Sequence, residues 1–327
     1  MIFLYFAVLA ASFALLFKSA DFFVDGACGI AESLNVSKMI VGIVLVGLAT
    51  TAPEFGVSVW AASLGEPEIA LGNAIGSVLV DDGIALALAA LLAPMVILVN
   101  CRILKVVGVF LLVIDGLAFL LASNGTIGRL EGGFLIALLV LYFVVLLRKK
   151  VFRSPSLEES LSTVKANTLS EVSGAKRGLR RPILLFASGI AGVIVTTRFV
   201  IWAAKNIADH FGIADTVIGL TVIAIGTSLP EISTCITAAR KGEGEIAVGN
   251  ILGADVLNVL WIIGVASLVN PIHVDVKVIH FTFPAMIVIV AVMLGSLAVG
   301  CRLNKGKGVL LLSLYGIYLF LTLILFI

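Results

Sequence analysis

Two stretches decide the fold of this chain, Gly47-Leu-Ala-Thr-Thr-Ala-Pro-Glu54 and Ala224-Ile-Gly-Thr-Ser-Leu-Pro-Glu231. Each lies inside a long apolar run and ends in a Pro-Glu pair, and the two glutamates are 177 residues apart. A carboxylate at bilayer depth costs about 2.5–3.5 kcal/mol on insertion scales, and proline removes a backbone N–H from a helix. Because both costly features occur twice, we interpret the stretches as the two halves of one cation site.

The composition is that of an integral membrane protein. The chain has 327 residues, of which 61% are hydrophobic and 13% charged, and apolar runs of about 20 residues recur along it, the length of a membrane-spanning helix. These runs are continuous rather than alternating, which disfavours a β-barrel. The net charge of +2, without a basic–aromatic patch, argues against nucleic-acid binding.

The pattern predicts an all-α polytopic fold with ten transmembrane helices, arranged as two inverted five-helix repeats in which the second and seventh helices are broken. The first repeat spans 1–147, with its motif at about 42–90. The second spans 182–327, with its motif at about 219–267. A polar connection at 148–181 separates them. We expect helices at about 2–32, 38–64, 68–94, 103–122, 130–147, 182–210, 214–240, 245–269, 276–299 and 308–327. No cleavage-site pattern follows Ile2, so we expect the first helix to be retained.

The distribution of Lys and Arg in short loops predicts the orientation of the chain. The connection at 148–181 holds nine basic residues against three acidic ones, which places it in the cytoplasm. Counting spans outward puts the basic clusters at 102–105, 240–241 and 302–307 on the same side, and it puts the turn at 65–68 and both termini outside. We expect a multi-pass protein of the plasma membrane.

The two halves align without a gap from the first helix through the third when one is shifted by 177 residues. The shift superimposes the key residues on identical ones, namely Thr50 on Thr227, Pro53 on Pro230 and Glu54 on Glu231. An odd number of spans in each half inverts the second half relative to the first. Inverted repeats with interrupted helices that meet at mid-membrane are typical of secondary transporters. A duplication kept only for packing would not explain a glutamate at bilayer depth in both halves.

The two stretches offer a ligand set suited to Ca2+, which takes roughly six to eight oxygen ligands. Mg2+ fits less well because it keeps its waters and requires a strict octahedron, and softer metals would need Cys or His partners. The candidate ligands are the carboxylates of Glu54 and Glu231, the hydroxyls of Thr50, Thr51, Thr227 and Ser228, and the carbonyls of Gly47 and Ala224, which we expect the prolines to free.

The third and eighth predicted helices add further polar groups. Asp81 aligns with Asn258, and Ser77 lies one turn before Asp81. Asp82 and Asp255 lie off that face, so we expect them to line a polar cavity or to pair laterally. Both helices also carry glycines that allow close helix packing and asparagines that either bind the ion or hydrogen-bond between helices, namely Gly72, Asn73 and Gly76 with Gly249, Asn250 and Gly253.

The four cysteines show neither CxxC nor Cys/His spacing. We therefore expect neither a disulfide framework nor a zinc site, and we interpret Cys28, Cys101, Cys235 and Cys301 as small apolar residues inside helices.

The motifs resemble those of the Ca2+/cation antiporter superfamily, of the Na+/Ca2+ exchanger type with two α-repeats. The family pattern G-T-S-x-P-E with G-N-x-x-G-S-N-x-x-[ND] corresponds to GTSLPE at 226–231 and GNILGADVLN at 249–258, and in altered form to LATTAPE at 48–54 and GNAIGSVLVDD at 72–82. The resemblance implies that Ca2+ binds Glu54 and Glu231 with Thr50, Thr227 and the carbonyls of Gly47 and Ala224, that Asp81 and Asn258 lie beside them, and that Ser77, Thr51 and Ser228 help to coordinate Na+ in the exchanger branch.

The chain departs from both branches of this family. The first repeat has Ala49-Thr50-Thr51 in place of Gly-Thr-Ser, and a serine of the second repeat is Ala254, which removes an oxygen from a family Na+ site. The proton-coupled branch usually carries G-N-x-x-E, where this chain has Gly76 and Gly253. We lean to H+ as the counter-ion, because the carboxylates need no further ligand to carry protons. Na+ is the alternative.

We predict a secondary antiporter in which Ca2+ and a monovalent cation, H+ or Na+, bind one acidic site in turn. The first and sixth helices would slide across the core and open one face at a time. Asp21 aligns with Arg198, and the two either form a charge pair across the halves or line an interface. We expect Ca2+, the monovalent cation and the lipid bilayer as partners, and a chain that works as a monomer.

Three rival classes fit less well. A Ca2+-permeable channel would use similar acids, but channels usually form symmetric oligomeric pores. An intramembrane aspartyl protease would need paired Tyr-Asp and Gly-x-Gly-Asp motifs that the sequence lacks, so we expect no enzyme. A purely structural membrane protein leaves the two buried glutamates unexplained.

Overall fold

The computed structural model describes residues 2–148, 179–211 and 224–326. In the first half the helices are α1 (Ile2–Leu34), α2 (Lys38–Val41), α3 (Gly47–Ser63), α4 (Pro67–Val80), α5 (Leu86–Leu92), α6 (Cys101–Ala122) and α7 (Arg129–Arg148), with π-helical segments η1 (Gly42–Val46) and η2 (Asp81–Ala85). In the second half they are α9 (Arg180–His210), α11 (Ala224–Thr227), α12 (Leu229–Arg240), α13 (Gly244–Leu257), α14 (Ile263–Val269), α15 (Phe283–Ala298) and α16 (Lys305–Phe326), with η5 (Asn258–Ile262) and η6 (Val278–Thr282).

Nine helical spans within the described residues are long and apolar enough to cross a membrane. They correspond to the predicted helices except the seventh, whose first part falls on 212–223, outside the described residues. The described part of that helix, α11 and α12, continues the bundle. The prediction of a polytopic all-α fold is therefore confirmed.

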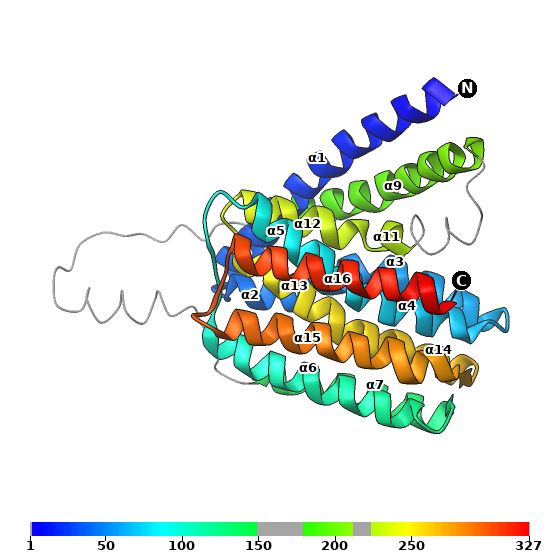
Figure 1. The fold of residues 1–327 in the computed structure, drawn as a ribbon. Helices are drawn as coiled ribbons and strands as arrows, with labels where there is room; N and C mark the ends of the chain where they lie inside the picture. The colour runs from blue at the N-terminus through cyan, green and yellow to red at the C-terminus, as the bar shows by residue number, and fades with distance from the viewer. Residues whose placement is uncertain (1, 149–178, 212–223, 327) are drawn as a thin grey trace, which may run out of the picture.

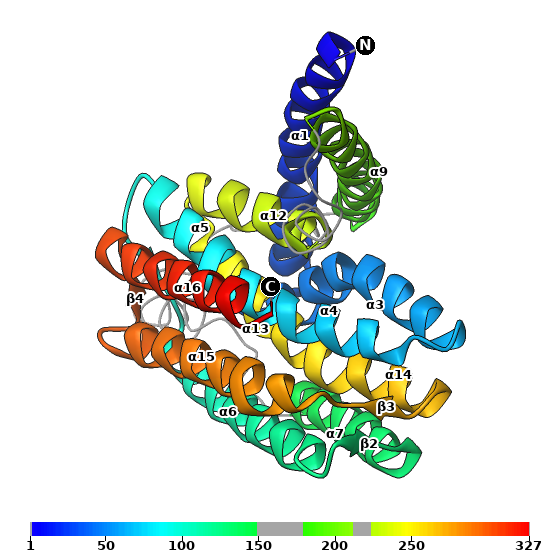
Figure 2. The same cartoon turned by 45° about the vertical axis from the view of Figure 1, so that its right-hand side comes forward.

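The helices form a bundle with one antiparallel pair, α1 and α9, set at its edge (Figures 1 and 2). The pair packs tightly, because Gly26 lies against the main chain of Phe186, and Gly189 lies against that of Phe23. We name the end of the bundle where α7 ends and α9 begins the loop face. The opposite end, which carries both termini (Figure 1), is the terminal face.

Two short antiparallel strand pairs tie the halves together, one at each face. At the loop face β1 (Ile97–Leu98) pairs with β4 (Arg302–Leu303), and at the terminal face β2 (Thr126–Ile127) pairs with β3 (Ile272–His273). Each pair takes one strand from each half, and the 177-residue relation maps one pair onto the other within two residues. The relation thus carries a strand pair from one face to the opposite face, which an inverted repeat requires because its second half is upside down relative to the first.

The glycines of α13 allow another close contact between the halves. A Cβ atom on Gly249 would meet the carbonyl oxygen of Met39, and one on Gly253 would meet that of Ile43. The predicted close packing is thus found in the second repeat. The related partners of Gly72 and Gly76, at 216 and 220, lie outside the described residues.

The helix interruptions differ between the halves. In the first half α2, η1 and α3 form one continuous helix with Pro53 inside α3, and the irregularity is the π-helical segment η1 just before the motif. In the second half the chain leaves helical geometry at Ser228, which has φ −88° and ψ 9° and begins α12. π-helical turns inside α-helices often occur at functional sites, so both halves are irregular at the motif, each in its own way.

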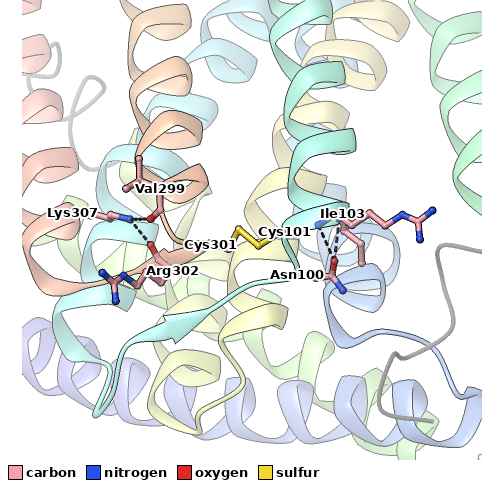
Figure 3. The surroundings of a disulfide bond; sticks show 8 residues. Asn100, Cys101, Ile103, Val299, Cys301, Arg302 and Lys307 are labelled. Carbon is pink, nitrogen blue, oxygen red and sulfur yellow. Dashed lines mark hydrogen bonds between the residues drawn. A yellow bond between two sulfur atoms is a disulfide. The ribbon is translucent and has the colours of Figure 1, made fainter. Parts of the chain in front are cut away.

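The prediction for the cysteines is wrong for one pair. Cys101 and Cys301 form a disulfide with their Cα atoms 5.4 Å apart, and Figure 3 shows it between the start of α6 and the turn that precedes α16. The two residues are 200 positions apart in sequence, so spacing gives no sign of the bond. They meet because the β1–β4 pair lies directly beside them, with the Val99 N–H donating to the Cys301 carbonyl oxygen at 3.0 Å. Cys28 and Cys235 are free thiols in helices, as expected.

We expect Cys301→Ser to lower the melting temperature of the purified protein, because the disulfide restrains two segments far apart in sequence and such bonds contribute about 2–4 kcal/mol in soluble proteins. Thermal unfolding followed by circular dichroism measures the shift. Cys101→Ser should give the same shift, and the double variant should add nothing further. A full shift from Cys101→Ser on top of Cys301→Ser would show that the two sulfurs are not bonded.

Candidate cation site

Glu54 connects the two halves in the interior of the bundle. It lies on α3 and is fully buried. Its Oε1 atom accepts hydrogen bonds from the Ser77 hydroxyl at 2.6 Å and from the Ser228 hydroxyl at 2.9 Å. Ser77 belongs to the first half and Ser228 to the second. The two serines, both predicted as site residues, therefore fix Glu54 from opposite repeats.

Glu231 lies in the first turn of α12 and is also fully buried. The hydroxyls of Thr50 and Thr51 lie beside its carboxylate. An acidic side chain at a helix N-terminus is favoured by the helix dipole. Hydroxyl groups of the first repeat thus lie beside the second glutamate without a hydrogen bond to it, whereas Ser228 of the second repeat donates to the first glutamate.

Asp81 and Asn258 approach the two glutamates from the first turns of η2 and η5. Asp81 lies close enough to Glu54 and Glu231 for their charges to interact, and Asn258 lies beside Glu54. All four side chains are fully buried. The structure therefore brings together the residues that the sequence aligned at this pair of positions.

Two reciprocal contacts repeat across the halves. The Thr50 hydroxyl donates to Asn250 Oδ1 at 3.1 Å, and the Thr227 hydroxyl donates to Asn73 Oδ1 at 3.4 Å. The 177-residue relation converts one contact into the other. Each asparagine also donates back to its own half, Asn73 to the Ser58 hydroxyl at 2.9 Å and Asn250 to the Cys235 sulfur at 3.7 Å. The structure thus shows both asparagines hydrogen-bonding between helices.

Many oxygen atoms at this site have no hydrogen-bond partner among the described residues. They are one carboxylate oxygen of Glu54, both of Glu231, both of Asp81, the amide oxygen of Asn258 and the hydroxyl of Thr51. Buried polar groups normally find partners, and these oxygens are the hard ligands that Ca2+ prefers. The donor set fits a hard cation as cargo.

Carboxylates alone do not complete a metal site in this conformation. Within the described ranges no group of three or more His, Cys, Asp or Glu side chains is placed to hold one ion. Neutral oxygens that could add to the carboxylates lie nearby, namely the unpartnered atoms of Thr51 and Asn258. The mixture of carboxylate, hydroxyl and carbonyl ligands stays a prediction.

The expectation that proline frees the carbonyls of Gly47 and Ala224 needs a correction. The N–H that proline lacks would bond the carbonyl four residues earlier, which is Ala49 for Pro53 and Gly226 for Pro230. The Gly47 carbonyl instead accepts a hydrogen bond from the Thr50 hydroxyl at 3.3 Å. Gly47 and Ala224 therefore remain predicted ligands, but the prolines are not what would free their carbonyls.

Sequence reasoning missed Asp115. It is fully buried on α6, and its carboxylate lies near those of Asp82 and Asp255. Asp82 and Asp255 lie beside each other, which agrees with the expected lateral pair. The signal for Asp115 was a single acid within the apolar run 103–122. That run belongs to a helix without a repeat motif, so the residue was not singled out.

Several known proteins to which this chain is similar are named as antiporters or exchangers. The chain matches the family described as sodium/calcium exchanger protein over residues 4–148 and 181–324. It is 33% identical to the putative antiporter CaxA of Alkalimonas amylolytica, with 92% of this chain and 93% of that protein covered. It is 29% identical to the sodium/calcium exchanger MaX1 of Methanosarcina acetivorans, with 96% and 97% covered. The solved structure of the sodium-calcium exchanger NCX_Mj aligns with a TM-score of 0.78 at 26% identity, covering 97% of this chain and 98% of that one.

We expect Glu54→Gln and Glu231→Gln each to weaken Ca2+ binding by more than about tenfold, because Ca2+ affinity depends on the number of charged ligands. Isothermal titration calorimetry of the purified chain measures the affinity. The matched control is Glu66→Gln, at an exposed acid that precedes α4, and it should bind Ca2+ like the parent. Full-strength binding by either site variant would remove that glutamate from the site.

Proposed function

Because the chain belongs to the sodium/calcium exchanger protein family, we propose that it exchanges Ca2+ for a monovalent cation at the site between its two halves. The family match and the relatives confirm the predicted superfamily, the inverted-repeat helical fold and a secondary transporter rather than an enzyme. The two repeats, 1–147 and 182–327, and the ligand set at their junction are part of the proposal.

One observation carries the proposal: three fully buried carboxylates, Glu54, Glu231 and Asp81, lie close together inside the bundle with five of their six oxygens unpartnered among the described residues. Unpaired charge at this depth is costly. A cation that enters the site removes the cost, and so does protonation. The site therefore favours occupation by one cargo or the other, and this mutual exclusion is what exchange requires.

Residues around the site would help to bind the transported ion. Glu54 is held by Ser77 and Ser228, so one of its oxygens keeps a fixed position. Glu231 and Asp81 are free to turn toward an ion. The Thr50–Asn250 and Thr227–Asn73 contacts hold the motif segments of the two halves in register.

We propose H+ as the counter-ion. Ala254, buried on α13 where the family pattern has serine, offers no hydroxyl to a second monovalent site. Beyond the three site carboxylates, Asp82, Asp115 and Asp255 are also fully buried near one another. Carboxylates bind protons without further ligands, so this region can store several protons but is short of neutral oxygens for Na+.

Na+ is the second candidate, and two observations favour it. Ser77 and Ser228 place hydroxyl oxygens beside Glu54, where a small monovalent ion could use them. MaX1 and NCX_Mj are both named sodium/calcium exchangers. Transport by either ion uses the same glutamates, so the choice rests on which gradient drives Ca2+.

We propose that the loop face is cytoplasmic, that both termini lie outside in a plasma membrane, and that the chain works as a monomer. The nine basic residues between 148 and 181 support this orientation. The Cys101–Cys301 disulfide lies at the same face, although disulfides are rare in the cytoplasm. The basic residues weigh more, because they act during insertion, whereas a disulfide forms after the chain is placed.

In proteoliposomes we expect a pH gradient, with the interior acidic, to drive Ca2+ uptake in the absence of Na+. Radioactive Ca2+ trapped in the vesicles measures the flux, and a protonophore should abolish it. An outward Na+ gradient at uniform pH should drive little uptake. The reverse pattern would establish Na+ as the counter-ion, and uptake without either gradient would indicate a channel.

Fusion of alkaline phosphatase after Ile327 should give an active enzyme, because we place the C-terminus outside and this reporter needs an oxidising compartment to form its disulfides. A fusion inserted at Ser160, in the central connection, should be inactive. Phosphatase activity of intact cells provides the measurement. The opposite result would invert the topology and place the Cys101–Cys301 disulfide in an oxidising compartment.

A further inference from the structure

Lys241 ties the edge helix α1 to the bundle at the loop face. Its ammonium group lies 2.7 Å from the carboxylate of Asp25 and 3.4 Å from that of Asp21. It also donates to the Asp21 carbonyl oxygen at 3.1 Å. Both acids lie on α1, whereas Lys241 directly follows α12, the helix that carries Glu231. We name Lys241, Asp21 and Asp25 the Lys241 cluster.

The turn that carries Lys241 is fixed from within the bundle. Gly242 adopts a φ of +77°, and the Glu243 N–H donates to the Ala238 carbonyl oxygen at 2.8 Å. One residue beyond Gly242, the Glu243 carboxylate pairs with Lys38 of α2 at 2.6 Å. The turn is thereby held in place, so the Lys241 cluster joins the edge helix α1 to an anchored turn.

Among the described residues, the positions related to the cluster by the 177-residue offset carry no such pairing of opposite charges. The 177-residue relation maps Lys241 onto Leu64 and Asp25 onto Trp202, both uncharged, and maps Asp21 onto Arg198. Leu64 is 66% exposed and Trp202 45% exposed. The ion pair that the sequence alignment left conceivable, Asp21 with Arg198, is not the one formed, since Asp21 pairs with Lys241.

Like the Lys241 cluster, the packing of α1 against the bundle is concentrated at the loop face. Its buried residues lie between Ser12 and Ala31 and become denser toward the loop face, where it packs against α12. Its first residues are exposed, with Phe3 at 86%. Figures 1 and 2 show the N-terminal end of α1 leaning away from the bundle at the terminal face. The helix is thus closed onto the core at one face only.

We propose that the Lys241 cluster is an electrostatic latch that holds the α1–α9 pair against the bundle at the loop face and favours the conformation closed on that side. Movement of α1 along or away from α12 has to break these contacts. The consequence for transport rests on the proposed function, but the latch itself does not.

A native thiol reports whether the latch is closed. Cys28 lies on α1, one turn beyond Asp25, and is half-buried with its thiol facing Glu243. Cys101 and Cys301 are bonded to each other, and Cys235 is fully buried. Alkylation of Cys28 by a small maleimide, read by peptide mass, therefore measures how often α1 separates from the turn at 241–243.

The first test uses Lys241→Gln in the full chain, purified without Ca2+. The alkylation rate of Cys28 should rise about two- to fivefold, the scale expected when a partly exposed ion pair is lost. Lys241→Arg keeps the charge and should keep the parent rate. The matched control is Arg240→Gln, because Arg240 is the exposed neighbour and makes no ion pair among the described residues. Equal rates for Lys241→Gln and Arg240→Gln would overturn the proposal.

The second test is a double-mutant cycle. The pair Asp21→Asn with Asp25→Asn should speed Cys28 alkylation as Lys241→Gln does, and combining all three should add nothing, because one interaction is being removed. Additive effects would show that the groups act independently and would overturn the latch. If no variant or parent transports Ca2+, the proposed function fails, while the alkylation rates still decide the latch.

Discussion

A carboxylate inside the membrane has to be satisfied by groups of the chain itself or by an ion, because hydrocarbon offers nothing in exchange for water. The two glutamates meet this constraint differently. Glu54 accepts two hydroxyl hydrogen bonds, whereas both oxygens of Glu231 are unpartnered among the described residues. One acid is therefore anchored and the other is available to an ion. The division of roles comes from Ser77 and Ser228, since both glutamates follow a proline at related positions of the two motifs.

Both repeats contribute hydrogen bonds to the buried polar groups of the site, so neither half forms it alone. Ser228 of the second half supports Glu54 of the first, and the Thr50–Asn250 and Thr227–Asn73 contacts cross in opposite directions. The two strand pairs also take one strand from each half. The inverted repeat thus builds one site at a shared interface. This explains why the motif is kept twice in a chain whose two copies otherwise differ in sequence.

The features that could be predicted from the sequence are those that occur in both halves. The helices, the inverted arrangement and the meeting of Glu54 and Glu231 all follow from apolar run length and a constant offset. Features that occur only once were not predicted, because they leave no recurring pattern in the sequence. Asp115 has no related partner, and Cys101 and Cys301 meet only because the β1–β4 pair, made of two-residue strands, brings their turns together. The π-helical segments also went unpredicted, because these runs are mostly apolar around the whole helix, so the rotation caused by an inserted residue leaves no visible break in the pattern. The offset also aligned Asp21 with Arg198, as a charge pair or as two interface residues, and gave no sign of the ion pair that Asp21 forms with Lys241.

A fully symmetric inverted repeat would make its two end states equal in energy, since each would be the other turned over. Any preference between them has to come from residues that break the symmetry, and a state is favoured only by interactions it makes and the other lacks. Two such differences lie at the loop face. The Lys241 cluster maps onto positions without an opposite charge, and the Cys101–Cys301 disulfide maps onto Val278 and Asn124. The disulfide joins α6 to the turn before α16, both within the bundle. The ion pairs hold α1 against the residue that follows α12. Because these ion pairs act at the loop face, the terminal face is the one at which the α1–α9 pair separates from the core with less cost.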